Sequence, residues 1–103
     1  MNSAKKQKTA DLLTICIKAG KAVKGFDSAK EYVMKGSACC VLTACDTSPK
    51  TLKEVRFMCE KSDIPVIVTE LEKSEIGALC GKDTAVIAVC DRGFAEGFVK
   101  IIT

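Results

Sequence analysis

Hydrophobic positions along the chain follow two alternating patterns. Three short stretches are almost wholly apolar, as expected for strands that are covered on both faces of a sheet. They span residues 38–45 (ACCVLTAC), 64–69 (IPVIVT) and 85–90 (AVIAVC). Around them, apolar residues recur every three or four positions, which is the spacing of amphipathic helices. This order predicts an α/β fold, a three-layer α/β/α sandwich around a small mixed, partly parallel sheet.

The first predicted helix follows a basic N-terminal segment. It begins at Thr9, which can act as its N-cap, and reaches Ala19. Asp11 would lie in the first turn, where a negative charge is favourable. Gly20 is a natural stop. We expect residues 1–8 to be flexible.

The second predicted helix lies between Gly25 and Gly36, after a short extended piece over residues 21–24. Asp27 or Ser28 can serve as its N-cap. If Ser28 is the cap, the glutamate three residues further on completes a capping box. The glycine at the far end closes the helix.

Three further helices are predicted in the second half of the chain. Ser48 followed by Pro49 is a strong helix start. A capping box over residues 69–72 would begin the next helix, which Gly81 ends, and Asp91 can cap the last one. The residues expected to face inward are Leu52, Val55, Met58 and Cys59 in the first of these helices, and Phe94, Phe98 and Ile101 in the last.

Length and hydropathy place the chain among small globular domains. Its 103 residues suit one domain, residues 1–103. No apolar run approaches the ~20 residues that a membrane helix needs. The lysine-rich start has no apolar segment behind it, as a signal peptide would have. We therefore expect a cytoplasmic (cytosolic) protein with no membrane partner.

Charge is distributed unevenly along the chain. Residues 1–36 hold eight lysines and three acidic residues, whereas the remainder holds eight basic and ten acidic residues. This asymmetry suggests a basic face for a polyanion. A solvated, lysine-rich N-terminus would explain the same charges, and charge alone does not distinguish the two.

The chain has seven cysteines and no histidine. It contains no C-x-x-C pair of the kind that structural zinc sites use, and most cysteines lie inside apolar runs. We expect buried free thiols that pack as small hydrophobic groups. Without histidine, a cysteine lacks its usual catalytic partner. No metal and no cofactor are expected.

Sequence motifs for nucleotide binding or hydrolysis are not found. There is no phosphate-binding G-x-x-x-x-G-K-[ST] loop, no G-x-G-x-x-G and no G-x-S-x-G. Asp46 and Asp91 follow buried strands, where parallel sheets often bind ligands. Turn formation and helix capping explain both aspartates more simply than a phospho-acceptor role. We expect no enzyme and no catalytic residues.

Three loops, expected at one end of the sheet, remain as candidates for binding an anion, over residues 24–30, 44–48 and 80–85. The first combines lysines with the free backbone N–H groups of a helix start, which attract phosphate. The third, CGKDTA, carries a lysine and small residues, so it could lie close to a nucleotide backbone or a base.

The order of these pieces resembles the large-subunit ribosomal protein L-seven-Ae/L-thirty-e family of kink-turn RNA binders, with the small bacterial members most similar. The resemblance covers roughly residues 9–99. It is carried by AGKAVKGFDSAKEYVMKGSACCVLTACDTSPKT and by IPVIVTELEKSEIGALCGKDTAVIAVCDRGFA. The best markers are the helix between two glycines, the acidic turn before SP, and the segments IPV, IGALCG and DRGFA.

The resemblance implies a four-stranded sheet and binding to kink-turns, which are RNA bends built on an internal loop with tandem sheared G·A pairs. The partner would be a kink-turn or ribosomal RNA, bound by a monomer that is ribosome-associated or regulatory. The implied RNA-binding residues are Lys24, Gly25, Asp27, Ser28, Lys30 and Glu31 at the helix start, Asp46 and Leu52 beside it, and Gly81, Lys82, Asp83, Thr84 and Ala85 in the loop before the last strand.

The helix start departs from the family pattern. Archaeal members carry Asn-Glu-x-Thr-Lys where this chain has residues 27–31, DSAKE. Glu31 falls where a phosphate-binding lysine is expected, and two acids near phosphates weaken binding by repulsion. One alternative is a protein of the same fold that has lost kink-turn affinity and acts as a protein- or ribosome-binding scaffold. A small enzyme or thiol switch is the third hypothesis.

Overall fold

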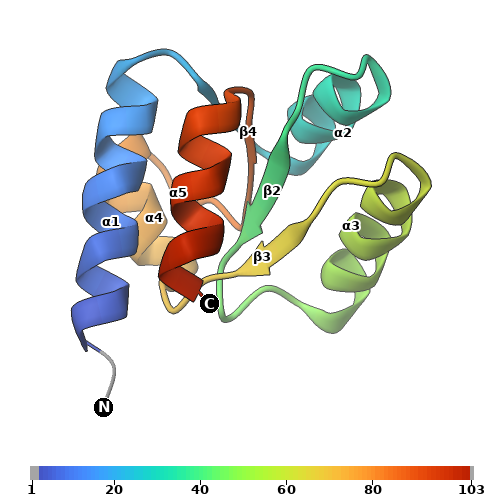
Figure 1. Cartoon of the computed structure of the whole chain (residues 1–103). Coiled ribbons are helices and arrows are strands. Elements are labelled where there is room, and N and C mark those ends of the chain that lie inside the picture. Colours follow the sequence, from blue (N-terminus) through green and yellow to red (C-terminus); the bar gives the residue numbers. More distant parts are fainter. Residues whose placement is uncertain (1–2, 103) are drawn as a thin grey trace.

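The computed structural model describes residues 3–102, which form five helices and four strands in three layers. Figure 1 shows α1, α4 and α5 on one face of the sheet and α2 and α3 on the other, so the predicted α/β/α sandwich is confirmed. None of these helices has the length and apolar character needed to cross a bilayer. The bounds are α1 Ser3–Lys18, β1 Ala22–Lys24, α2 Phe26–Met34, β2 Cys40–Thr43, α3 Pro49–Lys61, β3 Val66–Val68, α4 Lys73–Cys80, β4 Val86–Val89 and α5 Arg92–Ile102.

The four strands form one mixed sheet in the order β1-β4-β2-β3. Strand β4 is antiparallel to both neighbours, and Ala88 lies opposite Val23 of β1 and Val41 of β2. Strands β2 and β3 are parallel. The short extended piece after the first helix therefore supplies the fourth strand. Because β1 and β2 are antiparallel to β4, both finish at the end of the sheet where β4 begins.

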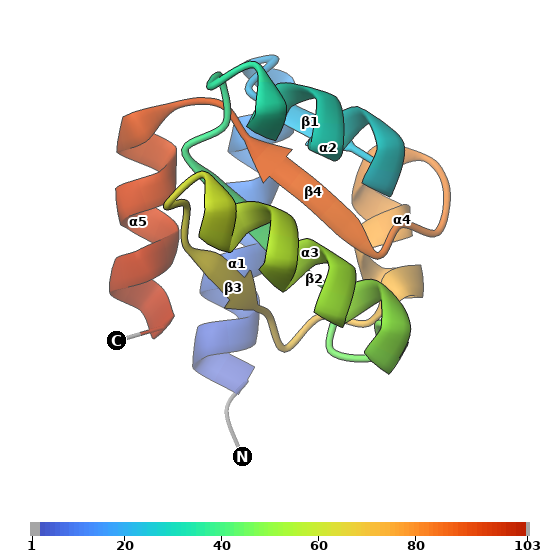
Figure 2. The ribbon, with the colours of Figure 1, turned by 90° about the vertical axis from the view of Figure 1, so that its right-hand side faces the viewer.

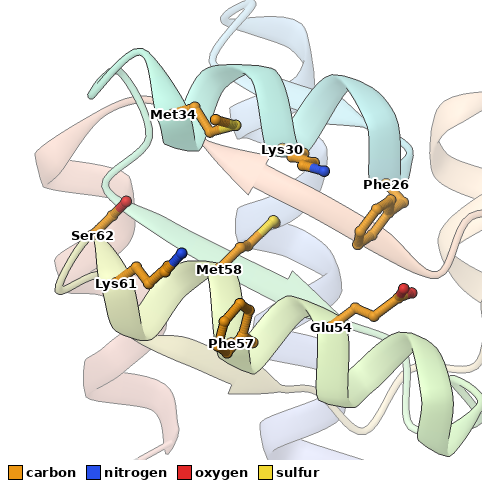
Figure 3. A pocket seen from close by; sticks show the side chains of 8 residues that line it. All are labelled: Phe26, Lys30, Met34, Glu54, Phe57, Met58, Lys61 and Ser62. Atoms are coloured by element: carbon orange, nitrogen blue, oxygen red, sulfur yellow. The ribbon is translucent and has the colours of Figure 1, made fainter.

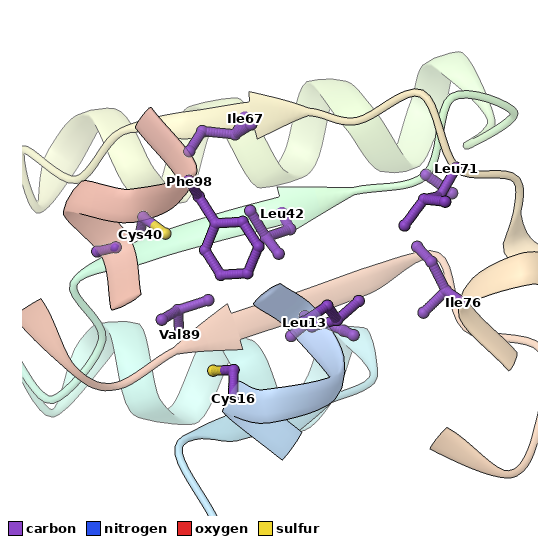
Figure 4. Close-up of a cluster of buried hydrophobic side chains, with 12 residues drawn as sticks. Leu13, Cys16, Cys40, Leu42, Ile67, Leu71, Ile76, Val89 and Phe98 are labelled. Atoms are coloured by element: carbon purple, nitrogen blue, oxygen red, sulfur yellow. The ribbon is translucent and has the colours of Figure 1, made fainter. Parts of the chain in front are cut away.

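Each face of the sheet has its own hydrophobic core. Phe98 and Leu13 lie in one cluster with Leu42 and Val89 of the sheet, beneath α1, α4 and α5 (Figure 4). Val33 and Val55 pack against the opposite face beneath α2 and α3. All four residues of β2 and all four of β4 are buried, as their apolar runs predict.

Strand β3 is less buried than its sequence predicts. It lies at the edge of the sheet, and Val68 is 39% exposed. A parallel edge strand has one neighbour only, so its outer side remains open. The apolar run over residues 64–69 does not distinguish an edge strand from a central one.

The first helix begins at Ser3, six residues earlier than predicted. Thr9 does not cap it: its hydroxyl donates to the carbonyl of Lys5 at 2.9 Å, inside the helix. Asp11 consequently lies in the third turn and accepts from the side chain of Gln7. Alanine, lysine and glutamine have high helix propensity, so the turns of α1 before Thr9 can form without an apolar face. Residues 3–8, which the sequence placed before the first helix, therefore belong to α1, and residues 1–2 lie outside the described part of the chain.

Two N-terminal lysines join α1 to other helices. The ammonium of Lys6 lies 2.7 Å from a carboxylate oxygen of Glu75 in α4. This hydrogen bond raises the pKa of Lys6 and lowers the pKa of Glu75. Lys5 donates to the carbonyl of Ile102 at 3.3 Å. The first turns of α1 are thus held by tertiary contacts as well as by helix propensity.

Of the helix starts predicted in the second half of the chain, two are confirmed and one is wrong. Ser48 caps α3 with Pro49 at its first position, and Asp91 accepts from the N–H of Phe94 at the start of α5. The capping box over residues 69–72 is absent. Instead, α4 begins at Lys73, and the N–H of the preceding residue bonds to the Glu75 carboxylate.

Thr69 has a different role from the one that its sequence context suggests. Its hydroxyl donates to the carbonyl of Thr43 at 2.9 Å and accepts from the N–H of Leu71 at 3.2 Å. Thr69 therefore fastens the end of β3 to β2 rather than starting a helix.

Replacing Phe98 with alanine should lower the free energy of unfolding by about 3–5 kcal/mol, because the ring is 1% exposed and its removal leaves a cavity. Urea denaturation followed by circular dichroism measures the loss. Phe57→Ala is the matched control: that ring is 61% exposed, so its change should stay within about 0.5 kcal/mol. Similar losses in the two variants would contradict this account of the core.

Candidate nucleic-acid interface

The three candidate loops lie together at one end of the sheet, where β1 and β2 end and β4 begins. The N–H of Gly25, at the end of β1, donates to the carbonyl of Val86 at 2.8 Å. The N–H of Ala44, just after β2, donates to the carbonyl of Ala85 at 2.9 Å. Both bonds continue the ladder on either side of β4. Figure 2 shows the result, with the loop between α4 and β4 beside the start of α2.

Helix α2 begins directly at the end of the β1 ladder. Gly25 is its N-cap with φ of +97°, a conformation that favours glycine, and no side chain caps the first turn. The expected N-cap at Asp27 or Ser28 is therefore wrong, and so is the capping box. Both side chains lie within the helix and are exposed. An uncapped first turn leaves backbone N–H groups for an external acceptor.

Lys24 joins the start of α2 to the end of α4. Its ammonium lies 2.6 Å from the carbonyl oxygen of Cys80, the last residue of α4. Carbonyl groups at a helix C-terminus attract cations, so this contact is favourable in both geometry and charge. Lys24 therefore holds two of the candidate loops together.

The loop over residues 81–85 is built by internal hydrogen bonds. Gly81 ends α4 in the left-handed conformation with φ of +104°, as predicted. Thr84 is 5% exposed; its hydroxyl donates to the carbonyl of Lys82 and its N–H to the carbonyl of Lys73. Lys82 and Asp83 are exposed. Thr84 thus supports the loop, while Lys82 and Asp83 form its surface.

Gly77 determines how closely this loop approaches α4, and the sequence reasoning missed it. A Cβ atom at this position would lie 2.7 Å from the backbone nitrogen of Asp83 and 2.8 Å from the carbonyl carbon of Lys82. Backbone atoms at that distance would have to move. The available signal was a glycine inside a helical pattern, which usually has a packing reason.

Asp46 acts as a cap for a helix distant in sequence. Its carboxylate accepts from the N–H of Lys73, the first residue of α4, at 2.8 Å and across 27 residues of sequence. The carbonyl of Lys73 accepts from the N–H of Thr84 at 3.3 Å, so Lys73 joins the loop of Asp46 to the loop of Thr84.

Leu52, the remaining predicted residue, lies half-buried near the start of α3.

The candidate interface has mixed charge. Its predicted RNA-binding residues include three lysines and four acidic residues. The lysines of α1 do not add to it, because α1 and α2 cover opposite faces of the sheet (Figure 1). The excess of lysines in residues 1–36 is therefore divided between two faces and does not form one basic surface.

All seven cysteines are free. Cys16, Cys40 and Cys59 are buried, and desolvation raises the pKa of these thiols to about 11, 12 and 11. Cys45 is exposed in the turn after β2, and its pKa is also raised by desolvation and by the neighbouring Asp46. Within residues 3–102, no group of three or more acidic or cysteine side chains is placed to hold a metal ion.

Comparison with known proteins gives one family. The family model for the ribosomal protein L7Ae/L30e/S12e/Gadd45 family matches residues 7–98. A protein from Enterococcus faecium, called RNA-binding protein YlxQ, is 28% identical over 102 residues, which are 99% of this chain and 98% of that protein. A protein of the same name from Bacillus subtilis (strain 168) is 30% identical over 92 residues, covering 88% and 91% of the two chains.

Solved structures share the fold. A protein of unknown function from Bacillus halodurans C superposes with a TM-score of 0.84 and 26% identity, over 90% of this chain and 94% of that one. The Giardia lamblia 15.5kD RNA binding protein superposes with a TM-score of 0.78 over 99% of this chain and 88% of that one. Its identity is 19%, so this likeness concerns the fold alone.

Gly77→Ala should displace the loop over residues 81–85 and lower the free energy of unfolding by about 1–3 kcal/mol, because the added methyl group meets backbone atoms. Amide hydrogen exchange should show faster exchange in this loop. Ser74→Ala, at an exposed position of the same helix, is the control and should have little effect. A Gly77→Ala protein with unchanged stability would mean that the loop moves freely.

The buried thiols predict a loss of stability at alkaline pH. Folding raises the pKa of Cys40 from the ordinary 9.0 to about 12, so the unfolded chain releases this proton at lower pH. The stabilisation is complete below pH 9 and is lost as pH rises towards 12. Urea denaturation from pH 8 to 11 should show the decline, and Cys40→Ala should make it shallower. Equal slopes in the two proteins would exclude this thiol as a cause.

Proposed function

We propose an RNA-binding function for this chain, which belongs to the ribosomal protein L7Ae/L30e/S12e/Gadd45 family. Its target would be a kink-turn or a similarly bent RNA. Two relatives that match nearly their whole length are called RNA-binding proteins. The observation that carries the proposal is that the start of α2 is held beside the loop over residues 81–85. Gly25 bonds to Val86 and Lys24 to Cys80, the residues that flank this loop.

The start of α2 suits a phosphate group. Its first-turn N–H groups have no side-chain cap, and the helix dipole favours an anion there. Lys30 is exposed one turn further on and can neutralise charge. Because Gly25 is fixed by the sheet, these groups need little rearrangement when RNA binds.

Selectivity would come from exposed polar side chains and from shape. Asp27 and Ser28 are exposed at the helix start, and a carboxylate can accept from the N–H groups of a guanine edge. The adjacent loop exposes Lys82 beside the small residue Gly81, so an RNA backbone could approach it closely. Phosphate contacts would position the RNA, and the polar side chains would read bases. We propose that the protein acts as a cytosolic monomer with a ribosomal or regulatory RNA.

A second candidate function is a scaffold of the same fold that binds protein or the ribosome surface. The charge of the interface favours it: four acidic residues accompany three lysines. Asp27 and Glu31 are exposed on α2, where phosphate groups would approach. A scaffold would bind no isolated kink-turn RNA at physiological salt.

The direct test is binding to a short kink-turn RNA and to the same RNA with its G·A pairs replaced, across a salt series. We expect preference for the intact RNA. Lys30→Ala and Lys82→Ala should each weaken binding by roughly 3- to 10-fold and reduce the salt slope by about 1, because each removes a phosphate contact. Glu31→Lys should strengthen binding by relieving repulsion.

Lys100→Ala is the control, since this exposed lysine lies on α5 on the other face of the sheet. Equal binding to both RNAs would leave only nonspecific attraction. Full affinity in both the Lys30→Ala and the Lys82→Ala proteins would show that the interface lies elsewhere. No binding to either RNA would favour the scaffold.

A further inference from the structure

A hollow of about 550 Å³ lies between α2 and α3, next to the candidate interface. Figure 3 shows Phe26 and Met58 pointing into the space between the two helices. The walls are mostly apolar, with charged side chains at the rim. The hollow is lined by Phe26, Lys30, Met34, Glu54, Phe57, Met58, Lys61 and Ser62.

Two large apolar side chains at this hollow are unusually exposed. Met34 is 73% and Phe57 61% exposed, the highest values for large hydrophobic residues in the described part of the chain. The core beneath is complete without them, since Val33 and Val55 are fully buried there. Both side chains line the same hollow, and an exposed apolar patch of this kind can mark a binding surface.

The ring of Phe57 is accompanied by positive charge. The ammonium of Lys61 lies 4.9 Å from the ring centroid. The ring also borders a second hollow of about 400 Å³, which is lined by Lys53, Arg56, Glu54 and Glu60 as well. An accessible aromatic ring with cationic side chains beside it is the arrangement that proteins use to hold unpaired nucleotides. Here three cations, Lys53, Arg56 and Lys61, outnumber the two carboxylates next to the ring.

The hollow is continuous with the start of α2. Phe26 is the first residue of this helix and directly follows Gly25, the N-cap. Lys30 belongs both to the hollow and to the predicted RNA-binding residues. A strand of RNA bound at the helix start would therefore enter the hollow between α2 and α3.

We propose that this hollow holds an unpaired nucleotide of the bound RNA, with its base stacked against Phe57 and its phosphates near Lys30 and Lys61. This proposal rests on the proposed function. The volume suits a small ligand rather than the length of a protein helix. Glu54 also lines the hollow, and its carboxylate can accept from the N–H groups of a base.

The test compares three RNAs: the kink-turn core alone, the core with a short unpaired extension at either strand end, and the extension alone. The wild-type protein should bind one extended RNA more tightly than the core. Phe57→Ala should remove this gain, about 5- to 30-fold, and leave binding to the core unchanged. Ile15→Ala is the control: it removes a side chain that is 56% exposed on α1, across the sheet.

Each outcome separates this proposal from the proposed function. If the core binds but no extension adds affinity, the nucleotide site is wrong and the proposed function stands. Loss of core and extended binding to the same extent in Phe57→Ala would also overturn the site. If only the single strand binds, and Phe57→Ala weakens it, the site is supported and kink-turn recognition fails. If no RNA binds, both proposals are overturned.

Discussion

The pairing of β4 with antiparallel strands on both sides is the constraint on which the rest of the structure depends. The ladder brings Gly25 to Val86 on one side and Ala44 to Ala85 on the other. A shift of the register by one residue would turn the side chains of β4 to the wrong faces and disrupt both cores. The hydrophobic cores therefore fix the same pairing that assembles the candidate interface.

Several polar groups at the candidate interface form hydrogen bonds within the protein. Lys24, Asp46 and Thr84 each bond to backbone atoms of another segment. Such bonds fix the backbone. Among the exposed charges that remain, Lys30 and Lys82 are outnumbered by Asp27, Glu31 and Asp83, so affinity would depend on pre-organised N–H groups more than on net charge. Met34 on α2 and Phe57 on α3 are largely exposed and contribute little to the core, and the proposed nucleotide site would account for their exposure.

Local sequence patterns were sufficient for most of the fold. The apolar runs of β2 and β4 predicted strands buried on both faces, because such strands need no polar alternation. Ser48 and Pro49 predicted the start of α3, and Gly81 predicted the end of α4, since these residues act within a single turn. The grouping of three loops at one end of the sheet was also expected from the sequence.

The sequence by itself thus determined the elements and their layers, through periodicity and capping that act over a few residues. Only the tertiary structure decided how the loops are held. Gly25 caps α2 because the ladder to Val86 ends there, and Asp46 caps α4 across 27 residues. Gly77 is required because Asp83 lies against it. These choices depend on contacts between distant segments, which no local pattern records.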